Sequence, residues 1–415
     1  MKKITFILLI GIALFTLVGC KSGFKDVKLK ETANFKYINH ISTPSIEKEY
    51  KSLDREFISN YNDFAYKALA SIYRDKNNNL YSPASLYMSL SMLLEGADGN
   101  SYDQIRNALG STSYIKTINK NLYANNYYQN DKGEARMANS YWININANIK
   151  EDYINTLNDN YYAEGFKTRF DDTAKSNMAK WINSKTKDLL NVKKEDFNNL
   201  EDMELCVINT IYFDNKWNKE FKTSNNTVDK FYTDEEVNCT YMYHEISSFY
   251  YVDESYSAVS DNFYNGNSIT YILPNEGVDI KDIINNINFR KTDEYSHNSY
   301  NVKLYVPKFK YNVKLDLEPI LRSMGIVDIF STTDANLSKI SDDYLYISEI
   351  TQGAGIEFSE EGVKAASYTK WGTKATAMEI PTNTIIFKLN RPFIYYISDS
   401  NGCILFMGTI NNPNK

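Results

Sequence analysis

The spacing of apolar residues predicts two helices early in the chain. One buried helical stripe, with apolar residues three and four positions apart, is formed by Tyr61, Phe64, Ala65, Ala68, Leu69 and Ile72. Further along, Ser82 and Pro83 have the pattern of a helix N-cap followed by proline at the first helical position. The residues from Leu86 to Leu94 are apolar on nearly every side. We therefore expect this second helix to lie at the centre of the protein.

Strand patterns dominate the second half of the chain. Alternating or strand-length apolar runs occur at 142–145, 206–213, 268–273 and 404–407. Helical patterns before strand patterns predict an α+β fold with a large, mostly antiparallel sheet. The 415 residues would allow two or three domains at about 150 residues each. Because we find no linker after residue 53 and few Gly (17) and Pro (8), we predict one domain over residues 52–415.

Residues 1–19 have the pattern of an export signal. Lys2 and Lys3 precede an apolar run from Ile4 to Val18, which is too short and poorly flanked for a membrane-spanning helix. Leu17-Val18-Gly19-Cys20 resembles a bacterial lipobox, and this implies cleavage before Cys20 and a lipid on its sulfur. Polar, lysine-rich residues follow, so we predict a lipidated tether over residues 20–51. Several acyl chains would hold the exported protein to the membrane of a bacterial cell envelope or surface.

Charge and histidine content exclude several classes of protein. The chain has 46 Lys and Arg against 52 Asp and Glu, a net charge of −6, and no long basic block. A protein that binds nucleic acid by neutralising phosphates would look different. We interpret the three histidines, His40, His244 and His297, as ordinary surface or half-buried residues, because they lie in polar or mixed stretches. We expect no metal site and no cofactor.

The remaining cysteines and motifs give no sign of an enzyme. After Cys20, the residues Cys206, Cys239 and Cys403 are too widely spaced for a disulfide framework. We find no G-x-S-x-G elbow, no H-E-x-x-H helix and no phosphate-binding P-loop. Gly353-Ala354-Gly355 is a bare G-x-G without the rest of a nucleotide-binding motif. We therefore predict that the protein is not an enzyme.

Six short motifs follow one another along the chain. They are Asn78-Asn79-Leu80-Tyr81-Ser82-Pro83-Ala84-Ser85, Asn209-Thr210-Ile211-Tyr212-Phe213-Asp214-Asn215-Lys216-Trp217, Val306-Pro307-Lys308-Phe309, Met324-Gly325-Ile326 through Phe330, Leu389-Asn390-Arg391-Pro392-Phe393 and Gly402-Cys403-Ile404-Leu405-Phe406-Met407-Gly408. In their order and spacing they resemble the serpin family, over about Lys51 to Pro413. The resemblance implies helices packed around a large central sheet, with smaller sheets and an exposed reactive-centre loop.

One further segment resembles the family hinge, from which the reactive loop emerges. It reads Glu360-Glu361-Gly362-Val363-Lys364-Ala365-Ala366-Ser367-Tyr368-Thr369. The resemblance implies a suicide inhibitor of serine endopeptidases, with cysteine endopeptidases as the other target class. Its loop would be cut, form a covalent acyl complex with the protease, and insert into the central sheet. We expect a monomer whose partners are this protease and, through Cys20, the membrane.

Insertion as a strand would place alternate residues of the loop on the core side of the sheet. If Val363 begins that set, it continues with Ala365, Ser367, Thr369, Trp371, Thr373 and Ala375. The outward set contains Lys364, Tyr368, Lys370 and Lys374. No charge lies in the inward set, which favours inhibition, because burying a charge is costly. Lys364, which departs from the family pattern, and the bulky Trp371 favour the alternative, a serpin that does not inhibit and acts as a surface binding or structural protein.

The family rule for counting from Gly362 predicts the scissile bond between Thr376 and Ala377. The stretch from Gly362 to Pro392 is longer than in most serpins, so Lys374 and Met378 remain alternatives. Small residues at the bond suit elastase-like or subtilisin-like proteases. Lys374 would instead suit trypsin-like proteases.

The resemblance also implies a set of residues where the sheet opens. They are Asn78, Ser82, Ser85, Asn209, Trp217, Lys308 and Gln352. Lys308 is expected to pair with Glu360. Many family members have His at the position of Gln352, which can hydrogen-bond Asn209 and Ser82 or Ser85 but cannot titrate. We therefore expect no pH step near 6.5 from this position.

Overall fold

The computed structural model describes residues 27–39, 53–110, 115–197, 200, 203–286, 299–366 and 383–415. Its helices are α1 (Arg55–Ile72), α2 (Pro83–Gly96), α3 (Gly99–Leu109), α4 (Ile115–Asn125), α5 (Glu151–Tyr161), α6 (Asp172–Thr186), α7 (Ile280–Asn286) and α8 (Glu318–Ser323). Its strands are β1 (Phe35–Asn39), β2 (Asn79–Tyr81), β3 (Tyr127–Asn130), β4 (Gly133–Asn144), β5 (Ala163–Thr168), β6 (Leu205–Lys216), β7 (Thr227–Tyr232), β8 (Glu236–Val252), β9 (Tyr256–Asn262), β10 (Ser268–Pro274), β11 (Ser299–Pro307), β12 (Lys310–Asp316), β13 (Thr351–Phe358), β14 (Gly362–Ala366), β15 (Thr384–Lys388), β16 (Phe393–Ser398) and β17 (Ile404–Ile410). Within these ranges, no helix combines the length and apolar character needed to span a bilayer.

The strands form two sheets. The central sheet has the order β1-β5-β4-β6-β14-β13-β12, with β3 beside β4. Its ladders are antiparallel except that between β4 and β5. The second sheet has the order β15-β11-β8-β9-β10-β16-β17-β2, with β7 beside β8. The predicted α+β fold with a large, mostly antiparallel central sheet is confirmed.

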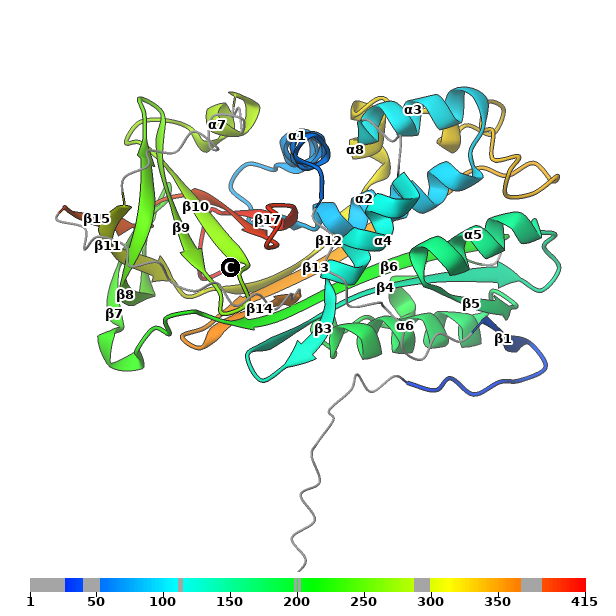
Figure 1. The fold of residues 1–415 in the computed structure, drawn as a ribbon, viewed down its shortest axis with the longest axis horizontal. Coiled ribbons are helices and arrows are strands. Elements are labelled where there is room, and N and C mark those ends of the chain that lie inside the picture. The colour runs from blue at the N-terminus through cyan, green and yellow to red at the C-terminus, as the bar shows by residue number, and fades with distance from the viewer. Residues whose placement is uncertain are drawn as a thin grey trace, which may run out of the picture.

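Helices cover both faces of the central sheet. Figure 1 shows α6 on one face and α2 and α5 on the other. The predicted stripe on α1 is buried from Tyr61 to Ile72. Ser82 caps α2 as predicted, and its side chain accepts a hydrogen bond from the Ser85 amide at 3.1 Å. Because α2 is apolar nearly all round, it can pack against both sheets at once.

A smaller core lies between α6 and the central sheet. Trp181 of α6, Trp142 of β4 and Phe166 of β5 are all fully buried there. The rings of Trp142 and Phe166 stack with their centroids 4.1 Å apart. Large aromatic side chains bury much apolar surface, so this cluster holds α6 firmly against the sheet.

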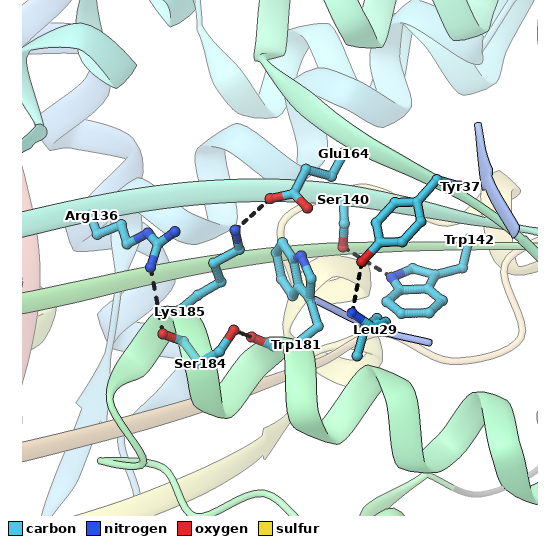
Figure 2. A network of polar contacts seen from close by, with 9 residues as sticks. All are labelled: Leu29, Tyr37, Arg136, Ser140, Trp142, Glu164, Trp181, Ser184 and Lys185. Carbon is cyan, nitrogen blue, oxygen red and sulfur yellow. Dashed lines mark hydrogen bonds and ion pairs between the residues drawn. The ribbon is translucent and has the colours of Figure 1, made fainter. Parts of the chain in front are cut away.

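Charged residues fix the C-terminal end of α6 (Figure 2). Lys185 of α6 forms a buried ion pair with Glu164 of β5. Arg136 of β4 donates a hydrogen bond to the carbonyl oxygen of Ser184 at 3.5 Å. Breaking a buried pair leaves an uncompensated charge, so this end of α6 resists displacement.

The N-terminal strand differs from the sequence prediction. Residues 27–39 belong to the segment predicted as a lipidated tether, but β1 pairs with β5 at the edge of the central sheet. Phe35 is buried and stacks on Phe166, with ring centroids 5.7 Å apart. Tyr37 accepts a hydrogen bond from the Leu29 amide at 2.9 Å (Figure 2). Part of the predicted tether therefore belongs to the folded body, because two aromatics at alternate positions give β1 one apolar face.

The described cysteines are free thiols, in line with the expectation that they form no disulfide framework. Burial raises the pKa of Cys206 to about 12, and the nearby Glu349 adds to this effect. Burial also raises the pKa of Cys403 well above its ordinary value. Since the thiolate is the reactive form, the raised pKa values make both thiols less reactive near neutral pH.

The packing of β1 predicts a large effect of Phe35→Ala. Removing a buried ring from a core usually costs about 3 kcal/mol or more in the free energy of unfolding. The matched control is Ile38→Ala on the same strand, where the side chain is 40% exposed and the expected cost is below about 1 kcal/mol. Urea unfolding followed by tryptophan fluorescence measures both. Equal effects of the two variants would show that β1 is not packed as described.

Candidate functional site

Part of the predicted hinge is already a strand of the central sheet. β14 lies between β6 and β13 and is antiparallel to both. Val363 is fully buried in the main core, opposite Asn215 of β6 and Phe358 of β13. A Cβ on Gly362 would lie 2.1 Å from the backbone oxygen of Asn215, so only glycine allows the two strands to come this close.

Several predicted residues lie outside the described ranges. They are Cys20, the hinge residues Ser367, Tyr368 and Thr369, and the scissile-bond candidates Lys374, Thr376, Ala377 and Met378. Trp371, Thr373 and Ala375 of the predicted inward set lie there as well. The predictions for these residues stay predictions.

Beside β14, no described strand fills the central sheet between β6 and β13. β14 pairs with only the last four residues of β6, from Phe213 to Lys216, and with Glu357 and Phe358 of β13. Among the strands that the structure describes, no ladder joins the rest of β6 directly to β13. A cavity of about 760 Å³ lies there, lined by residues 205–212 of β6 and by Gly353, Ala354 and Gly355 of β13. We call this cavity the slot.

The slot is covered on both faces. Ser82, Ser85 and Leu86 of α2 line one side. The other side is lined by Ile182 and Thr186 of α6 and by Leu189, Leu190 and Val192, which follow α6. Leu190 lies against β13, since a Cβ on Gly355 would be 3.3 Å from its side chain. The end of α6 that the buried Lys185–Glu164 pair fixes is therefore part of the cover.

Gln352 ties β13 to the start of α2 at the slot. Its side-chain oxygen accepts from the Ser82 amide at 2.8 Å, and its side-chain nitrogen donates to the Ser82 carbonyl at 3.1 Å. The expected contact with Ser82 is therefore present, through the backbone. Asn209 does not join it, but donates to Asn139 of β4 at 2.6 Å. Because neither Gln352 contact depends on a titrating group, this tie is insensitive to pH.

An ion pair and a tryptophan hold the residues before the hinge strand, Ser359–Glu361, which we call the hinge base. Lys308 contacts both carboxylate oxygens of Glu360 at 2.9 Å, as expected from the sequence. Trp217 is fully buried and donates from its indole nitrogen to the Ser359 carbonyl at 2.9 Å. Its backbone amide donates to the Glu361 carbonyl at 3.1 Å. The hinge base is thus bound through both side chains and backbone.

Asn226 is a site residue that the sequence analysis missed. Its side-chain nitrogen donates to Glu360 at 2.6 Å. Burial alone would raise the pKa of Glu360, but the hydrogen bonds from Asn226 and Lys308 outweigh burial and lower the pKa. No local pattern marks Asn226, since it is brought to Glu360 only by the packing of the segment before β7.

Two sequence interpretations need correction. Asn78 is not at the slot, because its side chain donates to the carbonyls of Asn412 and Lys415 at the C-terminus. His244 was expected at the surface or half-buried, but it is only 4% exposed. It lies on β8, in a stretch of mixed polarity that hides its inward direction.

The ladder between β14 and β6 contains an irregularity that bears on insertion. The register shifts between Lys364 and Ala366, so β14 has one extra residue at this point. If the strand extended and kept this β-bulge, every side chain beyond the bulge would point to the opposite face of the sheet. Tyr368, Lys370 and Lys374 would then point toward the core instead of outward.

The lowered pKa of Glu360 predicts an acid-sensitive hinge base. A lowered folded-state pKa stabilises the protein fully above the unfolded pKa of about 4.3, and this contribution is lost as the pH falls through the folded value. Glu360→Gln should therefore lower the melting temperature at pH 6, and its difference from the wild type should shrink as the pH falls below about 4.3. Glu357→Gln, which removes the more exposed pair with Lys310, is the control and should show a smaller difference. If the difference in melting temperature between Glu360→Gln and the wild type did not shrink as the pH falls, this account would be contradicted.

Similarities to known proteins agree with this geometry. Residues 59–413 match the family model described as Serpin (serine protease inhibitor). A serpin-like protein of Methanosarcina acetivorans is 29% identical over 354 residues, which cover 82% of this chain and 83% of that protein. Neuroserpin of Mus musculus is 26% identical, over 86% of this chain and 91% of neuroserpin.

A solved structure shows the same fold. Tengpin, a thermophilic serpin crystallised in the native state, matches with a TM-score of 0.75 and 29% identity, over 88% of this chain and 96% of tengpin. The match to the family model covers most of the chain, and the matched residues include those of the hinge strand, the hinge base and the walls of the slot. This protein therefore belongs to the serpin family, whose members are in general inhibitors of serine proteases.

Proposed function

We propose that this serpin is a suicide inhibitor of serine endopeptidases, with cysteine endopeptidases as a further target class, and that it traps the acyl-enzyme by loop insertion. The observation that carries the proposal is the slot. β14 occupies one end of it, and the cavity continues along β6 and β13 in the direction in which the loop would extend. Strand addition of this kind uses the backbone hydrogen bonds of both neighbouring strands.

The covalent step follows from ordinary serine protease chemistry. The serine hydroxyl attacks the carbonyl carbon of Thr376 and forms an ester. The bond between Thr376 and Ala377 breaks, and the proton passes to the amine of Ala377. Water would normally hydrolyse the ester and release the protease, so trapping requires insertion to be faster.

The number of residues that the slot can hold fits the predicted position of the scissile bond. Lys364 lies opposite Asp214. If pairing continued one for one from there, without the register shift that follows, residue 373 would lie opposite Leu205, the first residue of β6. Thr376 would then lie just beyond the far end of the slot. The fourteen residues from Gly362 to Thr376 span about 46 Å in a strand, so a bound protease would travel most of the length of the sheet.

The alternative function is a serpin that does not inhibit and serves as a surface binding or structural protein. The β-bulge at Lys364–Ala366 is the observation that favours it, because an extending strand that kept the bulge would turn lysines toward the core. Inhibition therefore requires the bulge to disappear as the strand extends. An intact protein that melts no lower than its loop-cleaved form would favour the alternative, since trapping needs stored strain.

We also propose that the protein is exported and anchored through Cys20 to a bacterial cell envelope or surface. The lipobox-like sequence before Cys20 supports this. With Phe35–Asn39 paired at the edge of the central sheet and the described chain beginning at residue 27, six residues, 21–26, separate Cys20 from it. They reach at most about 24 Å when extended, so the anchor would hold the edge of the sheet near the membrane.

Mixing the soluble protein, without its first 26 residues, with a panel of proteases tests the inhibition. We expect a protease–serpin adduct that resists boiling in denaturant, and release of a C-terminal fragment that begins at Ala377. Mass spectrometry of that fragment decides between this bond and the alternatives at Lys374 and Met378. Cleavage by every protease without any adduct would contradict the proposal.

The matched variants for this experiment are Val363→Glu and Val363→Thr. Val363 is fully buried, so a carboxylate there has no favourable place in the inserted strand. Val363→Glu should be cut at the same bond without forming an adduct. Val363→Thr keeps the shape of the side chain and should form the adduct. An adduct of normal yield with Val363→Glu would show that trapping does not use this strand.

Membrane anchoring predicts a clear effect of Cys20→Ala in a bacterial host. The wild type should incorporate labelled fatty acid and sediment with membranes, because several acyl chains bind a bilayer strongly. Cys20→Ala should do neither. Equal labelling of both proteins would rule out Cys20 as the lipidated residue.

A further inference from the structure

The edge of the central sheet at β1 carries a surplus of positive charge. Residues 27–39 and 163–170, which contain β1 and β5, have five cations against two carboxylates, although the whole chain is more acidic than basic. All five cations are exposed, and they are Lys28, Lys30, Lys36, Lys167 and Arg169. In the described part of the chain, no carboxylate forms an ion pair with any of them. We call this surface the basic edge.

The neighbouring carboxylates are engaged elsewhere. Glu164 is buried in the ion pair that fixes the end of α6. Glu31 accepts a hydrogen bond from the Tyr37 amide at 3.0 Å, so its carboxylate is held against the backbone of β1. Asp171 caps α6, and Asp172 forms an ion pair with a lysine that follows α6. The positive charge of the basic edge therefore faces solvent.

The ladder between β1 and β5 brings two of these charges together. Lys36 lies directly opposite Lys167. The Cβ atoms of such a pair are about 5 Å apart, and like charges at these positions destabilise a sheet. Phe35 and Tyr37 hold β1 in this register, because both rings pack against Phe166. The packing thus maintains a like-charge contact that an external anion would relieve.

Exposed aliphatic side chains accompany the charges. Val27 is 36% exposed and Ile38 is 40% exposed, and both belong to the same short segment as three of the lysines. Cations beside aliphatic groups suit the interface of an anionic bilayer, where the cations meet lipid phosphates and the aliphatic groups enter the headgroup region. A soluble polyanion would use only the charges, so this composition favours a membrane.

We propose that the basic edge docks on the anionic phospholipid surface of the membrane that holds the anchor. The inference rests on the proposed anchoring through Cys20, from which six residues lead to the described chain, and it deepens that proposal. The lipid would keep the protein at the membrane, and the basic edge sets how the protein lies there. Figure 1 places β1 at one end of the molecule and β15 at the other. Docking therefore leaves the end with β15, which follows the predicted scissile bond in the chain, accessible to proteases.

Vesicle binding by the chain without its lipid tests the docking. The protein is residues 20–415 with Cys20→Ala, and the vesicles contain equal parts of phosphatidylglycerol and phosphatidylcholine. Each cation near such a surface strengthens binding about fivefold, so Lys36→Gln combined with Lys167→Gln should weaken binding about 25-fold. Because both lysines are exposed and repel each other, these substitutions do not threaten the fold.

The matched control is Lys67→Gln combined with Lys281→Gln. Both lysines are exposed, and they lie on α1 and α7, which Figure 1 shows well away from β1. This control should leave binding within about twofold of the wild type. Binding should also be lost with pure phosphatidylcholine and should weaken as salt is added, because the charges are exposed to solvent.

Equal weakening by the two double variants, or no binding of the wild type to the anionic vesicles, would overturn the proposal. Binding to soluble polyphosphate without binding to the vesicles would overturn it as well. Fatty-acid labelling of Cys20 is a separate measurement. If labelling failed, the anchor would be lost, and the vesicle data would still decide whether the basic edge docks on anionic lipid.

Discussion

The interruption of the central sheet is the constraint on which the rest of this structure depends. Among the described residues, the edges of β6 and β13 beyond β14 face a cavity instead of each other. Backbone groups at such edges are strong hydrogen-bonding groups, and proteins rarely leave them unpaired. Eight further residues in the slot would add hydrogen bonds worth on the order of 10 kcal/mol in total, at about 1 kcal/mol each. The sheet therefore favours the addition of a strand, and β14 is the segment already aligned to supply it.

In the proposed mechanism, the surrounding contacts keep the slot open until the loop is cut. Gln352 binds both backbone groups of Ser82 and fixes β13 to α2. On the opposite face, the buried pair between Lys185 and Glu164 fixes the end of α6, beside Leu190. At the top of the slot, the hinge base is held by Lys308, Asn226 and Trp217. Each contact stabilises the open sheet without filling it, which is the condition for storing free energy in a native state.

Much of the fold was predictable, because the signals that carry it are local. The stripe on α1, the cap of α2 and the inward direction of Val363 follow from periodicity and from short-range chemistry. β1 was missed because lysines and other polar residues dominate the surrounding segment 20–51, and within β1 only Phe35 and Tyr37 mark an apolar face. Asn226, His244 and the true place of Asn78 depend on contacts between segments far apart in the chain. No local pattern contains that information, and the slot itself exists only in the assembled sheet.

Hydrogen exchange of β6 before and after cleavage of the loop measures strand addition most directly. In the intact protein, the amides of residues 205–212 that point away from β4 face the slot. This account predicts that they exchange quickly before cleavage. After cleavage they should become as protected as the amides that pair with β4. Slow exchange already in the intact protein, or fast exchange that persists after cleavage, would contradict the claim that the slot receives the loop.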